Sequence, residues 1–208
     1  MALYLGKNKA ARCSITDILG QPYYIDTRQI KNFSYFCYNN TRLDIVDRFD
    51  TSNGTDFSYM FYGCNSLISA PQLDTSNGTD FSSMFYGCNS LISVPQLDIS
   101  NGIRISNVFQ NCMNLQSVSL TKARIDFNTG VFTGCTALTN VTIGEGWNTS
   151  IYLHYSNNLT QECLHKMIEN FADLTGQTAK TFRIGTTNMA KIDAEHITML
   201  DNKNWDYQ

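Results

Sequence analysis

Hydrophobic and polar positions in the middle of the chain recur with a period of about 24 residues, which is typical of a repeat protein. Two consecutive segments, residues 56–79 and 80–103, differ at only four positions. Weaker copies precede and follow them, so that the array covers about five turns over residues 32–150. A lone turn of this size cannot cover its own apolar face, and neighbouring turns must therefore stack.

Within each turn the same apolar offsets recur, which indicates a short strand preceded by a helical or 3₁₀ turn. A Phe is followed by a Cys three residues later and by a Leu three residues after that. The predicted ladder consists of Phe61, Phe85, Phe109, Phe132, Cys64, Cys88, Cys112, Cys135, Leu67, Leu91, Leu115 and Leu138. We therefore predict an α+β fold, a leucine-rich-repeat solenoid of about five turns of about 24 residues with its phenylalanines in one buried column.

The repeated motif is Met-Phe-x-x-Cys-x-x-Leu, and the turns are joined by Leu-Asp-x-Ser-Asn-Gly. This combination resembles the BspA-like leucine-rich repeats of bacterial and phage surface proteins, and the resemblance covers residues 33–147. It implies adhesion or recognition on an extended face, without catalysis. A repeat scaffold does not by itself fix the function.

The segment before the array has a different pattern. The first ten residues are similar to the opening of many tail and baseplate-associated proteins in phages of Gram-positive hosts. Residues 1–31 are therefore expected to form an N-terminal attachment segment that contacts other virion proteins.

The segment after the array, residues 151–208, predicts a C-terminal helix–strand–helix cap. Thr160 is suited to cap a helix that ends near residue 175, residues 180–184 alternate as a short strand, and Asp193 is suited to cap a second helix. Such a cap covers the open edge of the last turn. A similar ending with a terminal Trp follows such repeats in phage and Firmicutes proteins.

Composition and charge exclude several classes of function. Charged residues are 16% of the chain, below the average of roughly 25% for soluble domains, and the net charge is −3. No Lys occurs between Lys31 and Lys122, so we expect no nucleic-acid partner. The chain also has no apolar run long enough to cross a bilayer and no apolar segment after its N-terminal charges. We therefore expect neither membrane insertion nor a secretory signal.

The cysteines of the ladder recur once in each turn, at one phase of the repeat. No Cys-x2–4-Cys pair suggests zinc, and parallel Cβ vectors on stacked turns suit disulfides poorly. We expect inert buried thiols, with a disulfide or a metal as the lesser alternatives. Cys13, Cys37 and Cys163 are isolated and expected to be structural.

Aspartates form two further columns, Asp50, Asp74 and Asp98, and Asp56 and Asp80. Stacked carboxylates could bind Ca²⁺, but a calcium loop needs more ligands and a Glu at its twelfth position. The alternative is an Asx-turn, in which the side chain bonds nearby backbone N–H groups. The sequence leaves calcium open.

The inventory for catalysis is poor. His154, His165 and His196 lie outside the strong repeats, and Glu162 with His165 makes only half of a di-metal motif. No nucleophile elbow, zinc protease motif or P-loop is present. We expect no enzyme, no catalytic residue, no metal site and no cofactor.

The outward positions of the two near-identical turns are the candidate binding residues. They are Tyr62, Tyr86, Ile68, Ile92, Gln72 and Gln96. Rigid aromatic, aliphatic and amide groups suit contact with a protein or a cell-surface glycan. The alternative is that the tyrosines cover loops and the isoleucines favour β structure.

We therefore expect a non-enzymatic structural or recognition module of a phage tail or baseplate, made in the bacterial cytoplasm and located in the virion. The alternatives are a bacterial cell-surface adhesin and a passive spacer or decoration protein. Self-association of the chain is left open.

Overall fold

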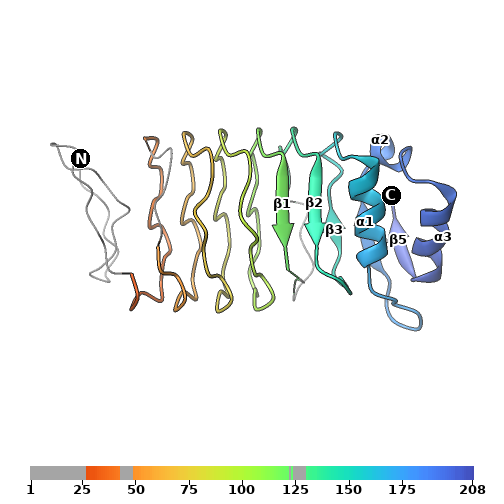
Figure 1. Cartoon of the computed structure of the whole chain (residues 1–208), viewed down its shortest axis with the longest axis horizontal. Coiled ribbons are helices and arrows are strands. Elements are labelled where there is room, and N and C mark those ends of the chain that lie inside the picture. Colours follow the sequence, from red (N-terminus) through yellow and green to blue (C-terminus); the bar gives the residue numbers. More distant parts are fainter. Residues whose placement is uncertain (1–26, 43–48, 122, 124–129) are drawn as a thin grey trace.

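The computed structural model describes residues 27–42, 49–121, 123 and 130–208. It shows an elongated stack of chain turns that ends in a cap of helices and strands (Figure 1). Within the described residues, regular strands in the stack are β1 (Ser117–Leu120) and β2 (Asn140–Ile143), which pair in parallel. Cys13 and most of the expected attachment segment, residues 1–26, lie outside the described residues.

The turns lie on one another with a nearly constant offset that equals the sequence period. Isolated parallel bridges join Asp56 to Asp80, Ser69 to Ser93, and Ser93 to Ser117. The backbone N–H of Phe57 donates to the carbonyl of Asp80 at 2.8 Å. Because the offset matches the period, equivalent side chains of successive turns face each other.

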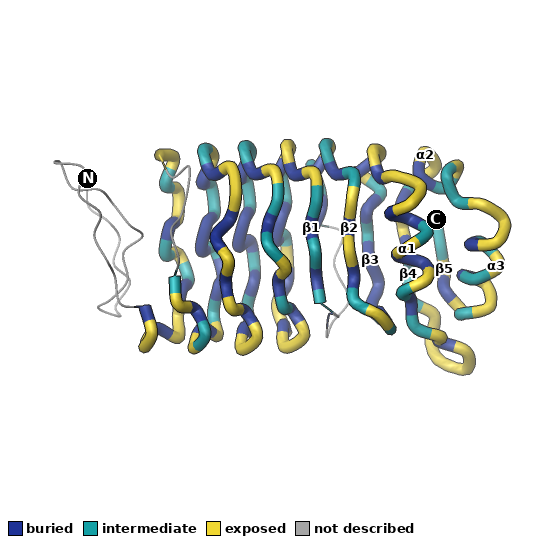
Figure 2. Tube along the Cα trace, viewed as in Figure 1, coloured by how far each residue is buried: buried dark blue, intermediate teal, exposed yellow. Residues whose placement is uncertain are grey.

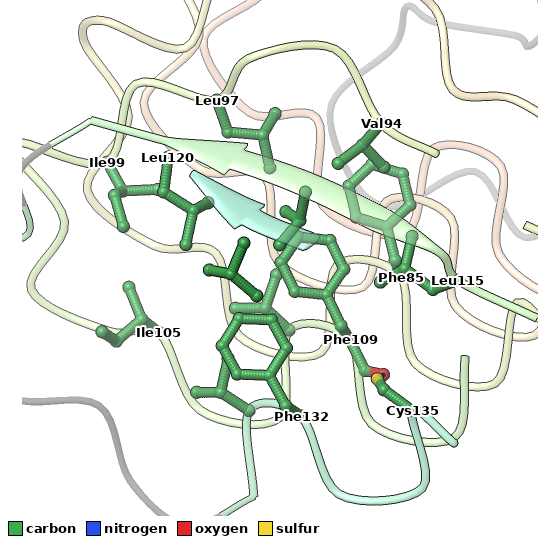
Figure 3. Packing of buried hydrophobic residues seen from close by; sticks show 14 of the residues in the cluster. Phe85, Val94, Leu97, Ile99, Ile105, Phe109, Leu115, Leu120, Phe132 and Cys135 are labelled. Carbon is green, nitrogen blue, oxygen red and sulfur yellow. Dashed lines mark hydrogen bonds between the residues drawn. The ribbon is translucent and has the colours of Figure 1, made fainter. Parts of the chain in front are cut away.

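The interior of the stack is filled by columns of like side chains, and the bends carry most of the exposed positions (Figure 2). Two phenylalanine columns run through it: Phe33, Phe57 and Phe81 in one, and Phe61, Phe85, Phe109 and Phe132 in the other. All seven rings are buried, and neighbouring ring centroids are 5.3–5.7 Å apart. Figure 3 shows Phe85, Phe109 and Phe132 of the second column in succession, with Leu115 and Cys135 of the ladder near them.

The cap adds a second parallel sheet and three helices. The sheet has the order β3 (Ile151–Tyr152), β4 (Lys180–Arg183) and β5 (Trp205–Tyr207). The helices are α1 (Gln161–Asn170), α2 (Thr186–Met189) and α3 (Ala194–Asn202). Helix α1 packs on β2 and on α3, and the N–H of Val141 on β2 donates to Cys163 Sγ at 3.1 Å. This helix therefore covers the last strand of the stack.

Helix α1 begins where the sequence predicts and ends earlier. Thr160 is its N-cap, and the hydroxyl oxygen accepts from the N–H of Cys163 at 3.1 Å. The helix ends at Asn170 rather than near residue 175, because Phe171 is extended and forms a parallel bridge with Trp147. The Phe171 ring stacks on Trp205 at 4.0 Å, so burial of this ring outweighs another helical turn. The short helix α2 and the final strand β5 are additions to the expected helix–strand–helix order.

Among the described residues, no helix has the length and apolar character needed to span a membrane.

Candidate binding surface

A strained bend that recurs in four successive turns positions the candidate surface. Residues one period apart adopt left-handed backbone, with φ of 60° at Tyr35, 57° at Tyr59, 53° at Ser83 and 58° at Asn107. This region is uncommon for bulky residues and costs about 1–3 kcal/mol. Bonds between turns hold it, since the N–H of Tyr59 donates to the carbonyl of Ser82 at 2.9 Å. The stack thus dictates where these side chains leave the backbone.

Five tyrosines gather at these bends in two adjoining columns. Tyr35 stacks on Tyr59 at 4.7 Å. Tyr38, Tyr62 and Tyr86 form the second column, with ring centroids 5.0 and 4.7 Å apart. Tilted contacts of 5.2 Å between Tyr35 and Tyr38 and 5.7 Å between Tyr59 and Tyr62 join the columns. We call these five residues the tyrosine patch.

The tyrosine patch presents neutral phenols to solvent. Tyr35 and Tyr38 are 51% and 42% exposed, whereas the other three are partly buried. Burial raises the pKa of Tyr35 and Tyr62, and the neighbouring phenols raise it further. At the other end of the patch, the side-chain amide of Asn111 donates to the hydroxyl of Tyr86 at 3.3 Å. Stacking covers most ring faces, so the columns offer ring edges and hydroxyls at the spacing of the turns.

The other predicted binding residues lie further along each turn, past buried Leu67 and its equivalents. Ile68 and Ile92 are 49% and 41% exposed, and the N–H of Ile92 donates to the carbonyl of Ile68 at 2.9 Å. Gln72 and Gln96 are also exposed. These four side chains therefore form outward pairs in register, as Tyr62 and Tyr86 do.

Sequence reasoning missed three members of the tyrosine patch, Tyr35, Tyr38 and Tyr59. The signal was present, because Tyr38 lies one period before Tyr62 and Tyr35 lies one period before Tyr59. The upstream copy that holds Tyr35 and Tyr38 is otherwise degraded, and the position one period after Tyr59 is Ser83, so neither column is complete in the near-identical turns.

The aspartates of the first column, Asp50, Asp74 and Asp98, each stabilise a local backbone turn by hydrogen bonds. Oδ1 of Asp50, Asp74 and Asp98 accepts from both the N–H and the hydroxyl of the serine two residues later, at 2.6–3.1 Å. Burial would raise the pKa of Asp98, but hydrogen bonds from Ser100 and Thr121 lower it below its ordinary value. This is the geometry of the Asx-turn.

The cysteine column lies in the core. The six described cysteines are buried thiols, and none of them forms a disulfide with another described cysteine. The thiols of Cys64, Cys88, Cys112 and Cys135 each donate to a backbone carbonyl of the preceding turn, at 3.0–3.1 Å. Burial raises the pKa of Cys88, Cys112 and Cys163 above the ordinary value, and raises that of Cys135 to about 12. Protonated, inaccessible thiols are poor nucleophiles and poor metal ligands.

The constant offset and the in-register columns define a repeat protein built from stacked turns. Residues 14–123 match a protein family described as "Mycoplasma protein of unknown function, DUF285". These residues make up just over half of the chain, which therefore belongs to this family of BspA-like repeat proteins. No curated protein and no solved structure matches the chain.

Proposed function

We propose that the chain is a non-enzymatic recognition module, a leucine-rich-repeat solenoid that binds a protein or a cell-surface glycan through the tyrosine patch. The single observation that carries this proposal is the gathering of five tyrosines in two columns at one bend of the stack. Tyrosine supplies contact area and a hydroxyl at low entropic cost, and it is enriched among residues that dominate binding energy. The stack holds the rings in place before binding, which lowers the ordering cost further.

The proposed setting is a phage tail or baseplate, with residues 1–31 joining the module to the particle and the patch facing the host. The resemblance of the first ten residues to tail-associated proteins supports this setting. The alternative is a bacterial cell-surface adhesin, and the matching family is described from Mycoplasma, a bacterium, rather than from a phage. Immunoblotting of purified phage particles and protease treatment of intact cells distinguish the two locations.

The binding test replaces Tyr38 and Tyr62 together by Ser. Both rings belong to the column of three tyrosines, and the substitution removes its stacked contacts at 5.0 and 4.7 Å. We expect labelled protein to lose about 2 kcal/mol or more of affinity for host cells or their isolated surface polysaccharide, about 30-fold in Kd.

The matched control replaces Ile68 and Ile92 by Ser, since these side chains also form an outward pair on successive turns but lie outside the tyrosine patch. Unfolding midpoints of both variants are measured first, so that a loss of binding is not a loss of folding. If the folded Tyr variant binds like the wild type, or if only the Ile variant loses binding, the patch is not the binding surface.

A further inference from the structure

Two histidines and an aspartate meet where α1 packs on α3 in the cap. His165 lies in the middle of α1, Asp193 is the N-cap of α3, and His196 lies in the first turn of α3. The two imidazole rings stack with centroids 3.7 Å apart and an interplanar angle of 15°. From the sequence, His165 has Glu162 as a neighbour on the same helix. In the fold, its ring instead stacks on His196 of α3.

The three side chains aim donor atoms at one point. One donor atom from each of His165, Asp193 and His196 lies within 4.8 Å of the others. His165 Nε2 is 3.6 Å from Asp193 Oδ2, and His196 Nδ1 is 2.7 Å from Asp193 Oδ1. Oδ1 also accepts from the backbone N–H of His196 at 2.9 Å, so this oxygen fixes the start of α3 while Oδ2 faces His165.

One of these atoms makes no hydrogen bond within the part of the chain that the structure describes, although a carboxylate oxygen lies 3.6 Å away. His165 Nε2 is buried and makes no hydrogen bond, although buried polar atoms in proteins nearly always have a partner. A neutral imidazole nitrogen beside a carboxylate is a typical donor set for transition metals, whereas Mg²⁺ and Ca²⁺ prefer oxygen ligands alone.

We propose that His165, Asp193 and His196 form a binding site for a divalent transition metal ion of the zinc class, which joins α1 to α3. Zinc–ligand bonds of about 2.0–2.1 Å in tetrahedral geometry place ligand atoms about 3.3 Å apart. The donor atoms therefore approach by at most about 1.5 Å on binding, a movement that side-chain rotation supplies.

Glu169 on α1 is the fourth ligand, with Oε1 at 3.9 Å from His196 Nε2. Its other oxygen pairs with Lys166 at 2.8 Å, an exposed ion pair that costs little to rearrange. His165 and Glu169 also line a surface hollow with Gln161, Glu162 and Lys166, so the α1 side of the proposed site borders solvent.

The test is titration of the untagged full chain with ZnCl₂ in a calorimeter, with excess Mg²⁺ present. We expect one Zn²⁺ per chain and a rise in melting temperature, because an ion bound only by the folded state stabilises it. Co²⁺ in place of Zn²⁺ is expected to give the visible absorption of a tetrahedral site. A dissociation constant above about 100 µM is typical of a weak surface interaction. If no Zn²⁺ binding is detected at about 100 µM metal, the proposal is overturned.

Two variants assign the site. His165→Phe keeps the aromatic stack on His196 but removes the nitrogens, and we expect Zn²⁺ affinity to fall at least 10-fold. His154→Phe is the matched control, since His154 lies outside this cluster, in a tilted ring contact with Tyr155, and the variant is expected to bind Zn²⁺ with wild-type affinity. If His165→Phe folds and binds like the wild type, the site is elsewhere. If His165→Phe does not fold, Glu169→Gln is used instead, because Glu169 is exposed. We expect Zn²⁺ affinity to fall at least threefold in this variant, and unchanged affinity again overturns the proposal.

Discussion

Replacement of Phe85 by Ala tests whether the phenylalanine column holds the stack together. Phe85 is fully buried, and its ring lies between Phe61 at 5.3 Å and Phe109 at 5.7 Å. The backbone bond from the N–H of Phe85 to the carbonyl of Val108 at 2.9 Å does not depend on the ring. The substitution therefore removes side-chain packing and leaves a cavity between two turns.

The expected cost follows from this packing. Buried Phe→Ala substitutions cost about 3–5 kcal/mol, and each aromatic pair adds about 0.5–1.5 kcal/mol beyond burial. Because Phe85 takes part in two ring pairs, we expect about 4–5 kcal/mol, a large share of a typical stability of about 5–15 kcal/mol. With a urea slope of at most about 3 kcal/mol per M, the unfolding midpoint falls by more than about 1 M.

The assay is urea unfolding followed by circular dichroism, with hydrogen exchange as the second measurement. Each turn contacts only its neighbours, so lost amide protection is expected near Phe61 and Phe85 and not in β4 of the cap. Ile92→Ala in the same turn is the control, since this side chain is 41% exposed and its loss is expected to cost less than about 0.5 kcal/mol. A cost for Phe85→Ala below about 1 kcal/mol, or equal to that of Ile92→Ala, refutes the column as the source of stability.

Two further predictions concern the bends and the thiols. Gly87 has φ +70°, no atom lies within 4 Å of an added Cβ, and the equivalent Asn111 has φ 61°. Gly87→Asn is therefore expected to shift the free energy of unfolding by less than about 0.5 kcal/mol, and Gly87→Val to lower it by about 1–3 kcal/mol. Both are measured in the same urea assay, and equal shifts would show that backbone strain does not select the residue at this position. Burial raises the pKa of Cys135 from 9.0 to about 12, so its contribution to stability is complete below pH 9 and is lost as the pH rises toward 12, because the unfolded thiol ionises first. Urea midpoints between pH 8 and 11 are expected to fall less steeply in Cys135→Ala than in the wild type, and iodoacetamide is expected to leave Cys135 unmodified in the folded protein; rapid labelling contradicts its burial.

The repeat positions could be predicted because one period places many equivalent residues at once. Phe61, Phe85 and Phe109 are one period apart in the sequence. When turns stack with an offset equal to that period, equivalent side chains lie above one another, so these rings form one column. The N-caps Thr160 and Asp193 could also be predicted, since an N-cap depends on local sequence alone.

Sites that depend on packing between elements could not be predicted in this way. His165 and His196 lie on different helices, and their ring contact depends on how α1 and α3 pack, which no local pattern specifies. The early end of α1 has the same origin, because Phe171 leaves the helix to pair with Trp147 and to stack on Trp205.

The register of the stack also explains why the chain has few charges. A side chain repeated once per turn faces its own copy about 5 Å away, and two equal charges at that distance repel by about 0.8 kcal/mol even in water and by about 3 kcal/mol at an effective dielectric of about 20. An amide in the same place gains a bond instead. The side-chain amides of Asn77 and Asn101 each donate to a serine carbonyl of the preceding turn at 2.8 Å. Repetition therefore selects amides, hydroxyls and rings over charges.

The column that contains Asp56 and Asp80 shows how the chain treats charges that remain. Parallel bridges join Asn32, Asp56, Asp80 and Arg104 in succession, so the two carboxylates are followed by a guanidinium rather than by a third carboxylate. Arg104 pairs with Asp80 at 3.1 Å, and Asp56 accepts from the N–H and hydroxyl of Ser58. Like charges thus extend over two turns in this column, and over three in the column of Asp50, Asp74 and Asp98, where each carboxylate accepts bonds from a serine two residues later. A continuous surface along such a stack is most readily built from neutral hydrogen-bonding side chains, and this is the chemistry that the tyrosine patch offers a partner.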